Sequence, residues 1–314
     1  MAAKVYLREV GLRDGLQLAK SFLPTDRKVE WLVAEANAGV KAFEVTSFVP
    51  PKIIPQFGDA AAVSREALTI PGLEISALIP NIKGAELGIA AGVTRLNFVL
   101  SASEEHNLAN VRRSTRDSIS DFARLNELRA AYPGRKLVLA GGIATAFGCT
   151  ISGAVDEGRV IAIASEFLSL DADQLIIADT VGYATPNQVK RLLSNIVREA
   201  GRRQVIAHFH DTRGTGLANV VAALESGVTG FDASLGGLGG CPFAPGATGN
   251  INMEDAAYLL ESLGLDTGVD IDALTALRTR VEPWLPQETF TGGIAKAGLP
   301  KNFSSARRLS EELL

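Results

Sequence analysis

The chain has 314 residues, of which 46% are hydrophobic and 21% are charged, and this balance excludes a disordered or collagen-like protein. Its net charge of −4, without any basic block, argues against a nucleic-acid partner, and no apolar run reaches the ~18 residues of a membrane span. Two cysteines, Cys149 and Cys241, cannot make a disulfide framework, and no secretory signal core follows Met1. We therefore expect a cytoplasmic protein without a membrane partner.

Short apolar runs alternate with longer helical patterns along most of the chain. The apolar runs are nearly continuous, as is typical of buried parallel strands, and they cover residues 5–10, 42–47, 73–79, 95–100, 137–143, 174–179, 205–210 and 230–235. Helical patterns lie between them at residues 27–38, 84–91, 114–131, 155–169, 186–199 and 216–226.

Residue types at the ends of these segments support the helices. Thr25 is predicted to be the N-cap of the first helix, and Thr185 with Pro186 is a typical helix start. Glycines directly after four of the helices are typical of left-handed caps, namely Gly39, Gly92, Gly201 and Gly227.

Eight successive strand–helix units predict an α/β protein with a (β/α)₈ TIM barrel. We expect one barrel domain over residues 1–314, in which residues 253–314 form one or two additional helices and a tail. A doubly wound open sheet is the alternative. Such a sheet usually carries a G-x-G-x-x-G turn after its first strand, and the turn at residues 11–15 (GLRDG) lacks that spacing.

Polar residues gather where the predicted strands end, which is the functional rim of such a barrel. His208 and His210 alternate with Phe209 in the seventh strand, so both imidazoles lie on one face and are placed to bind a divalent metal. A pair of hydrogen-bonded core histidines is the alternative. Together with Asp14 and an amide oxygen, two imidazoles favour Mg²⁺ or Mn²⁺ over a thiolate-rich zinc site.

Arg13 and Asp14 follow the first strand, where the carboxylate could bind the metal and the guanidinium could stabilise an oxyanion. A solvated surface pair is the alternative. Glu44 lies within an apolar strand and needs a partner, for which Arg13 is the natural candidate, although this pair could be purely structural.

The segment 236–250 is too rich in glycine for a packing role and is typical of a loop that approaches a ligand. Cys241 within it could donate or accept a proton, or could be an inert small residue. We expect Cys149 to be structural. His106 is expected at the surface or the rim, with a substrate-facing position as the alternative.

Six segments together resemble the 3-hydroxy-3-methylglutaryl-CoA lyase family. They are residues 9–17 (EVGLRDGLQ), 46–52 (TSFVPPK), 80–84 (PNIKG), 179–182 (DTVG), 208–212 (HFHDT) and 236–250 (GGLGGCPFAPGATGN). The last segment is highly specific to this family, whereas the HFHDT segment is shared with related metal-dependent lyases and Claisen-type synthases.

The resemblance implies a (β/α)₈ barrel that binds Mg²⁺ or Mn²⁺ and cleaves an acyl-CoA to acetyl-CoA and a 3-oxo acid, which is acetoacetate for the methylglutaryl substrate. It also implies a homodimer or higher homo-oligomer. The implied metal ligands are Asp14, His208, His210 and Asn250. The implied catalytic residues are Arg13, Glu44, Asp179, His208 and Cys241, and the substrate-binding residues are Arg13, Gln17, Thr46, Asn81 and Thr180.

The sequence departs from the family pattern in the fifth strand, where family members have an arginine, a serine and a following proline. This chain has Ala140, Ala144 and Thr150 there, and it has Arg213 where a tyrosine is common. Small residues thus stand where the acyl group should lie, so the substrate could be a longer or differently branched 3-hydroxyacyl-CoA. Three different functions stay open beside the lyase, namely a Claisen-type synthase, an aldolase or decarboxylase on small oxo acids, and a metal-binding protein without catalysis.

Overall fold

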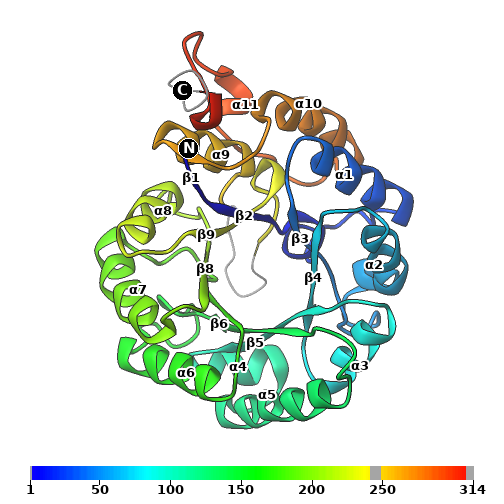
Figure 1. Cartoon of the computed structure of the whole chain (residues 1–314), viewed down its shortest axis with the longest axis vertical. Helices are drawn as coiled ribbons and strands as arrows, with labels where there is room; N and C mark the ends of the chain where they lie inside the picture. The colour runs from blue at the N-terminus through cyan, green and yellow to red at the C-terminus, as the bar shows by residue number, and fades with distance from the viewer. Residues whose placement is uncertain (1, 241–248, 309–314) are drawn as a thin grey trace.

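Eight parallel strands close into a barrel, as the sequence predicts (Figure 1). The structure is a computed structural model that describes residues 2–240 and 249–308. The strands follow one another around the barrel in chain order, and β2 pairs with β9 to close it. They are β2 (Tyr6–Glu9), β3 (Ala42–Ser47), β4 (Glu74–Ile79), β5 (Arg95–Ser101), β6 (Val138–Ala144), β7 (Gln174–Asp179), β8 (Gln204–Phe209) and β9 (Gly230–Ala233). The open-sheet alternative is therefore wrong.

A ring of helices surrounds the barrel, as Figure 1 shows. It consists of α1 (Thr25–Asn37), α2 (Ala60–Leu68), α3 (Ile82–Ala90), α5 (Thr115–Ala130), α6 (Glu157–Ser169), α7 (Pro186–Ala200) and α8 (Gly216–Glu225). The sequence patterns did not predict α2, whose nine residues span little more than two turns. A shorter helix, α4 (Glu104–Val111), follows β5, and the turn η1 (Gly11–Gly15) follows β2.

Additional helices lie at the side of the barrel between α8 and α1, with α10 next to α1 (Figure 1). Within residues 249–308, which the structure describes, they include α9 (Met253–Ser262), α10 (Ile271–Val281) and the single turn α11 (Ile294–Ala297), where one or two helices were expected. A two-stranded parallel pair, β1 (Ala3–Lys4) with β10 (Leu265–Asp266), joins this group to the start of the chain. Among the described residues, no helix is both long and apolar enough to cross a membrane.

The four glycines predicted to cap helix ends have positive φ angles, as expected, whereas the N-cap predicted at Thr25 is wrong. Gly39 has a φ of 103°, and a Cβ there would lie 2.1 Å from the carbonyl oxygen of Gly268, so only glycine fits. Thr25 is the first helical residue rather than the N-cap, because Pro24 precedes it in extended conformation, and its hydroxyl donates to Asp59 at 2.7 Å. Thr185 is the N-cap before Pro186, without a capping hydrogen bond from its side chain.

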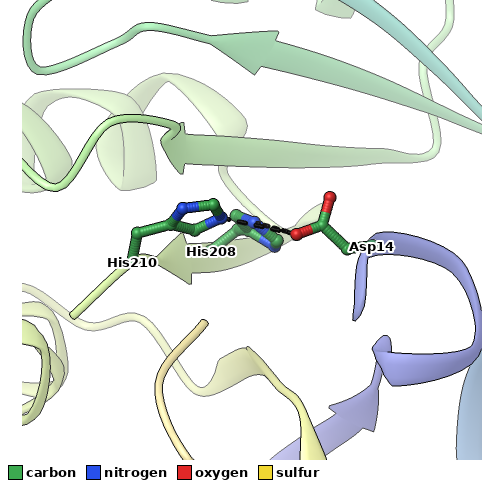
Figure 2. Close-up of side chains that lie close together, drawn as sticks. All are labelled: Asp14, His208 and His210. Carbon is green, nitrogen blue, oxygen red and sulfur yellow. Dashed lines mark ion pairs between the residues drawn. The ribbon is translucent and has the colours of Figure 1, made fainter. Parts of the chain in front are cut away.

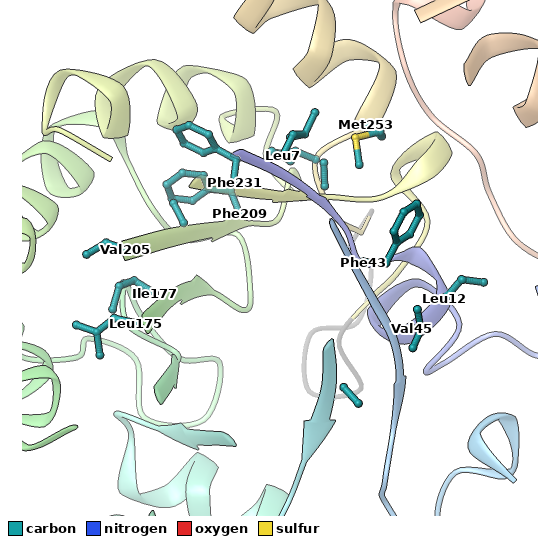
Figure 3. Packing of buried hydrophobic residues seen from close by; sticks show 14 of the residues in the cluster. Leu7, Leu12, Phe43, Val45, Leu175, Ile177, Val205, Phe209, Phe231 and Met253 are labelled. Carbon is teal, nitrogen blue, oxygen red and sulfur yellow. The ribbon is translucent and has the colours of Figure 1, made fainter. Parts of the chain in front are cut away.

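The main core lies between the barrel and its helices. Outward-facing strand residues such as Phe209 and Phe231 belong to this core together with the other residues labelled in Figure 3. Because side chains alternate along a strand, their neighbours His208 and Asp232 point into the barrel. The same alternation that builds the core therefore places polar groups inside the barrel at its carboxyl end.

Candidate active site and metal centre

Asp14, His208 and His210 meet at the carboxyl rim of the barrel (Figure 2). His208 lies in β8, His210 directly follows it, and Asp14 comes from the turn η1 after β2. Nε2 of His210 lies 3.4 Å from Oδ2 of Asp14, and Nε2 of His208 lies 3.9 Å from the same oxygen. The two imidazole rings are 5.2 Å apart, which confirms that alternation brings them to one face. All three side chains are buried.

Asn250, the fourth predicted ligand, lies beside Asp14. Its Nδ2 donates to Oδ2 of Asp14 at 2.8 Å and to the carbonyl oxygen of Leu238 at 3.0 Å. Its Oδ1 is buried and has no hydrogen-bond partner among the described residues. A buried amide oxygen without a partner is costly, and a cation would satisfy it. Two imidazoles, a carboxylate and this oxygen are a donor set that fits a divalent metal ion.

A second carboxylate orients His208. Asp232 in β9 lies 3.1 Å from Nδ1 of His208, and the buried Arg8 in β2 donates to both of its oxygens at 2.8 Å. Burial alone would raise the pKa of Asp232, but the guanidinium of Arg8 lowers it to about 2. The charged carboxylate holds the Nδ1–H proton, so Nε2 of His208 is left free to face Asp14.

Arg13 connects Asp14 with Glu44, as the sequence predicts. Its Nε donates to Glu44, and its Nη1 lies 2.5 Å from Oδ1 of Asp14. Asn97 donates to the other oxygen of Glu44 at 2.6 Å, so this buried carboxylate is fully paired. Burial would raise the pKa of Asp14, but the charge of Arg13, together with the two imidazoles, holds that pKa well below its usual range. Asp14 is thus ready to bind a cation.

Two buried carboxyl groups anchor the loops that carry these residues. Glu9 accepts from the backbone N–H of Gly11, where η1 begins, and from that of Leu235, after β9. Glu254 accepts from the N–H of Gly236 at 3.0 Å. Burial raises the pKa of Glu9 and the pKa of Glu254 to about 7. These groups therefore fix the starts of the segments that lead to Asp14 and to Asn250.

A cavity of about 360 Å³ opens onto the metal-ligating groups. Four of the five predicted substrate-binding residues line it, namely Arg13, Gln17, Asn81 and Thr180. Thr46 is buried in β3 and is not among the described residues that line the cavity. Asn81 also caps α3, because its side chain accepts from the N–H of Gly84 at 3.0 Å.

Asp179 ends β7, and its carboxylate accepts from the N–H groups of Tyr183 at 2.8 Å and Ala184 at 3.1 Å. Burial raises its pKa. In the structure it therefore fixes the turn that carries Thr180 at the cavity, while its predicted catalytic role stays a prediction. Cys241, the predicted acid or base, lies outside the described residues.

His106 lies at the rim, buried rather than at the surface, and the sequence did not predict the pair of Arg8 and Asp232. His106 is only 2% exposed, lines the cavity and contacts the Ser101 hydroxyl through Nδ1 at 2.7 Å. Of the two expected positions, the surface is wrong, while the rim agrees with the structure, because α4 folds over the rim after its N-cap Ser103. Cys149 is buried and accepts from the N–H of Ile151, in agreement with a structural role.

The fold and the site define a TIM-barrel enzyme with a candidate divalent-metal centre at its carboxyl rim. A family model described as HMGL-like matches residues 4–281. The chain belongs to the hydroxymethylglutaryl-CoA lyase family, whose members are carbon–carbon lyases.

Known proteins similar to this chain include hydroxymethylglutaryl-CoA lyase YngG of Bacillus subtilis, which is 37% identical over 89% of this chain and 92% of its own length. A 3-hydroxy-3-isohexenylglutaryl-CoA/hydroxymethylglutaryl-CoA lyase of Pseudomonas aeruginosa is 38% identical over 88% of this chain and 92% of its own. An HMG-CoA lyase of Acinetobacter baumannii, solved with coenzyme A and 3-methylmalate, superposes with a TM-score of 0.89 at 40% identity, covering 96% of this chain and 97% of its own.

Proposed function

We propose that this protein cleaves a 3-hydroxy-3-alkylglutaryl-CoA, of which 3-hydroxy-3-methylglutaryl-CoA is the simplest, into acetyl-CoA and a 3-oxo acid. The methyl substrate would give acetoacetate. One observation carries the proposal: Asp14, His208, His210 and Asn250 converge beside Arg13 at one cavity. Family membership and the coenzyme A bound to a similar structure support an acyl-CoA substrate.

We infer that Asp14, His208, His210 and Asn250 hold Mg²⁺ or Mn²⁺, because the set combines imidazole with hard oxygen donors. A cation bound there would supply a Lewis acid that lowers the pKa of the substrate hydroxyl and anchors its carboxylate. The pairing of His208 with Asp232 keeps the imidazole in one orientation and makes it a stronger ligand.

The proposed reaction breaks the bond between C2 and C3 of the acyl group. The tertiary hydroxyl gives its proton to a basic group at the cavity, for which Asp179 and His208 are the implied catalytic residues, and becomes the carbonyl of the 3-oxo acid. The electron pair of the broken bond passes to C2 and spreads onto the thioester oxygen. Arg13 lines the cavity and is fixed by Glu44 and Asp14, so its permanent charge is positioned to stabilise this enolate. Because the charge develops only during cleavage, this contact lowers the barrier selectively.

The enolate must then take up a proton at C2, and we propose Cys241 as the donor. The proposal rests on the specific glycine-rich sequence around this residue. Cys241→Ala should leave Mn²⁺ binding intact and lower turnover by orders of magnitude. Unaltered turnover would remove the thiol from the mechanism.

Release of acetyl-CoA from 3-hydroxy-3-methylglutaryl-CoA by Mn²⁺-loaded protein tests the function directly. Consumption of acetyl-CoA with 2-oxo acids would instead favour a Claisen-type synthase. Activity on small oxo acids without affinity for coenzyme A would favour an aldolase or decarboxylase. If the protein binds the metal but turns over no 3-hydroxyacyl-CoA, the result would favour a metal-binding protein without catalytic activity.

We also propose that the protein forms a homodimer or a larger homo-oligomer in the cytoplasm. The resemblance to the family supports the oligomer, and the two cysteines suit a reducing compartment. Light scattering during size-exclusion chromatography tests the oligomer, and fractionation of cells that express the chain tests the location.

A further inference from the structure

The strand residues that point into the cavity form two unlike sides. Polar residues of α4 and of the segment directly after it also line the cavity, namely His106, Asn110, Arg112 and Arg113. Strands β2, β3, β8 and β9 supply the charged side, with Arg8, Glu44, His208 and Asp232 pointing inward. Strands β4 to β7 supply the opposite wall. Apart from the polar Asn97 of β5, their inward residues that line the cavity are uncharged and apolar. They are Leu78, Val99, Gly142, Ala144, Ile176 and Ala178.

Two polar residues, Ser76 of β4 and Asn97 of β5, point into the barrel below the apolar wall, but they interact with the charged side. Asn97 donates to Glu44 at 2.6 Å and to the Ser76 hydroxyl at 3.3 Å, so both belong to the charged side. Below the apolar wall, Ala140 and Ile206 are packed and at most 1% exposed. The wall therefore rests on an apolar floor, without a charged group beneath it among these neighbours.

Open space lies in front of this wall. Leu78, Val99 and Ala178 are only half-buried although they point into the barrel, where inward side chains normally fill the interior. Gly142 adds to the space. For a Cβ placed there, the three nearest atoms all belong to the adjacent strand β5, the closest being the Phe98 carbonyl oxygen at 3.0 Å and the Val99 side chain at 3.6 Å.

The shape of the substrate relates this wall to the chemistry. C3 of a 3-hydroxy-3-alkylglutaryl group carries a hydroxyl, a thioester arm, a carboxylate arm and one alkyl branch. The three polar groups need the charged side, where Asp14, His208 and Arg13 lie. Since C3 is tetrahedral, the branch then points away from the hydroxyl and toward the apolar wall. A methyl group covers little of that wall.

We propose that the wall formed by Leu78, Val99, Gly142, Ala144, Ile176 and Ala178 is a subsite for an alkyl branch of several carbons. The preferred substrate is then a 3-hydroxy-3-alkylglutaryl-CoA with a branch longer than methyl. This inference rests on the proposed function. Burial of each further methylene should raise kcat/KM by about fourfold until the wall is covered.

The test compares 3-hydroxy-3-methyl-, 3-propyl- and 3-pentylglutaryl-CoA with Mn²⁺-loaded protein and follows acetyl-CoA release. We expect kcat/KM for the propyl substrate to exceed that for the methyl substrate by about tenfold or more. A kcat/KM that stays level or falls as the branch grows would overturn the subsite while leaving the lyase function in place.

Larger side chains in the wall should shift the preference from the propyl substrate toward the methyl substrate. Ala178→Val and, as a second variant, Ala144→Val should lower the ratio of kcat/KM between propyl and methyl substrates by about tenfold, because added methyl groups take the space of the branch. Ala130→Val, on the exposed outer face of α5, is the matched control and should leave the ratio unchanged. Equal ratios in the wall variants and the control would contradict the subsite.

Binding separates failure of the subsite from failure of the function. The 3-alkylglutaryl-CoA thioesters without the hydroxyl cannot be cleaved, and calorimetry gives their Kd. Binding that tightens with branch length, without turnover of any hydroxylated substrate, would retain the subsite and refute the lyase. A Kd that does not change with branch length would refute the subsite, whether or not the protein cleaves a hydroxylated substrate.

Discussion

Asp232 lies 3.1 Å from Nδ1 of His208 while both of its oxygens accept from Arg8 at 2.8 Å. The three residues come from β9, β8 and β2. Strand β9 pairs with β8, which precedes it along the chain, and it pairs with β2 only because the barrel closes. The carboxylate is kept charged by Arg8, so it sets the tautomer of His208 and directs Nε2 to the metal-ligating side.

Asp232→Asn should weaken Mn²⁺ binding by about 10- to 100-fold, because the neutral amide no longer fixes the imidazole and leaves Arg8 without its charge partner. Calorimetric titration with Mn²⁺ measures the change. Asp272→Asn, at an exposed carboxylate in α10, is the matched control. A folded Asp232→Asn protein with the wild-type affinity would show that this pair does not position the ligand.

Arg13→Lys should lower kcat by about 10²- to 10³-fold, although the positive charge is kept. Lysine cannot donate to Glu44 and Asp14 together in the geometry of the guanidinium, so the charge would lose its position beside the thioester. Single-turnover kinetics with saturating substrate measure the effect on cleavage itself. A lysine variant with full kcat would exclude a positioned guanidinium from the rate-limiting step.

Glu254→Gln should change how stability depends on pH. The folded pKa of Glu254 is raised to about 7 by burial, from an ordinary value of 4.5. Between these values the folded state holds a proton that the unfolded state has released, so the free energy of unfolding of the wild type falls as pH rises.

Glutamine cannot ionise, and its carbonyl can still accept from the N–H of Gly236. Relative to the wild type, Glu254→Gln should therefore gain roughly 2 kcal/mol between pH 5 and pH 8. Urea unfolding at both pH values gives this difference. A stability difference that is the same at both pH values would mean that Glu254 titrates normally in the folded protein.

Removal of divalent metal should lower the thermal midpoint. A ligand at about 100 times its Kd adds about 2.7 kcal/mol to the stability of the folded state, which for a chain of this size is roughly 5 °C. Calorimetric scans after EDTA treatment, and again after Mn²⁺ is added back, measure the shift. An identical response from Asp14→Ala would indicate that the cation acts elsewhere, since Asp14 is central to the cluster.

The strands were predictable because a buried parallel strand is apolar on both faces. The expected ranges 42–47 and 174–179 coincide with β3 and β7. His208 and His210 were predictable because two polar residues at alternate positions stand out in an apolar strand. The pairing of Glu44 with Arg13 followed from the cost of a lone buried carboxylate.

Other contacts depend on the closed barrel and were not predictable. Arg8 and Asp232 are 224 positions apart and meet only through the pairing of β2 with β9. His106 stands beside two glutamates in the sequence, which is typical of a surface helix, but the helix folds over the cavity. The apolar wall was not predictable either, because its residues come from four strands. The sequence pattern within one strand does not show which residues of the other strands lie beside it.

Anomalous diffraction at the manganese edge, from crystals of the protein grown with Mn²⁺, would locate the bound cation and its ligands. We predict one strong peak per chain, coordinated by Asp14, His208, His210 and Asn250. Bond lengths of about 2.0–2.3 Å to all four side chains would identify them as the ligands. A peak coordinated by other residues, or no metal bound to these four side chains at saturating Mn²⁺, would show that they do not form the metal site.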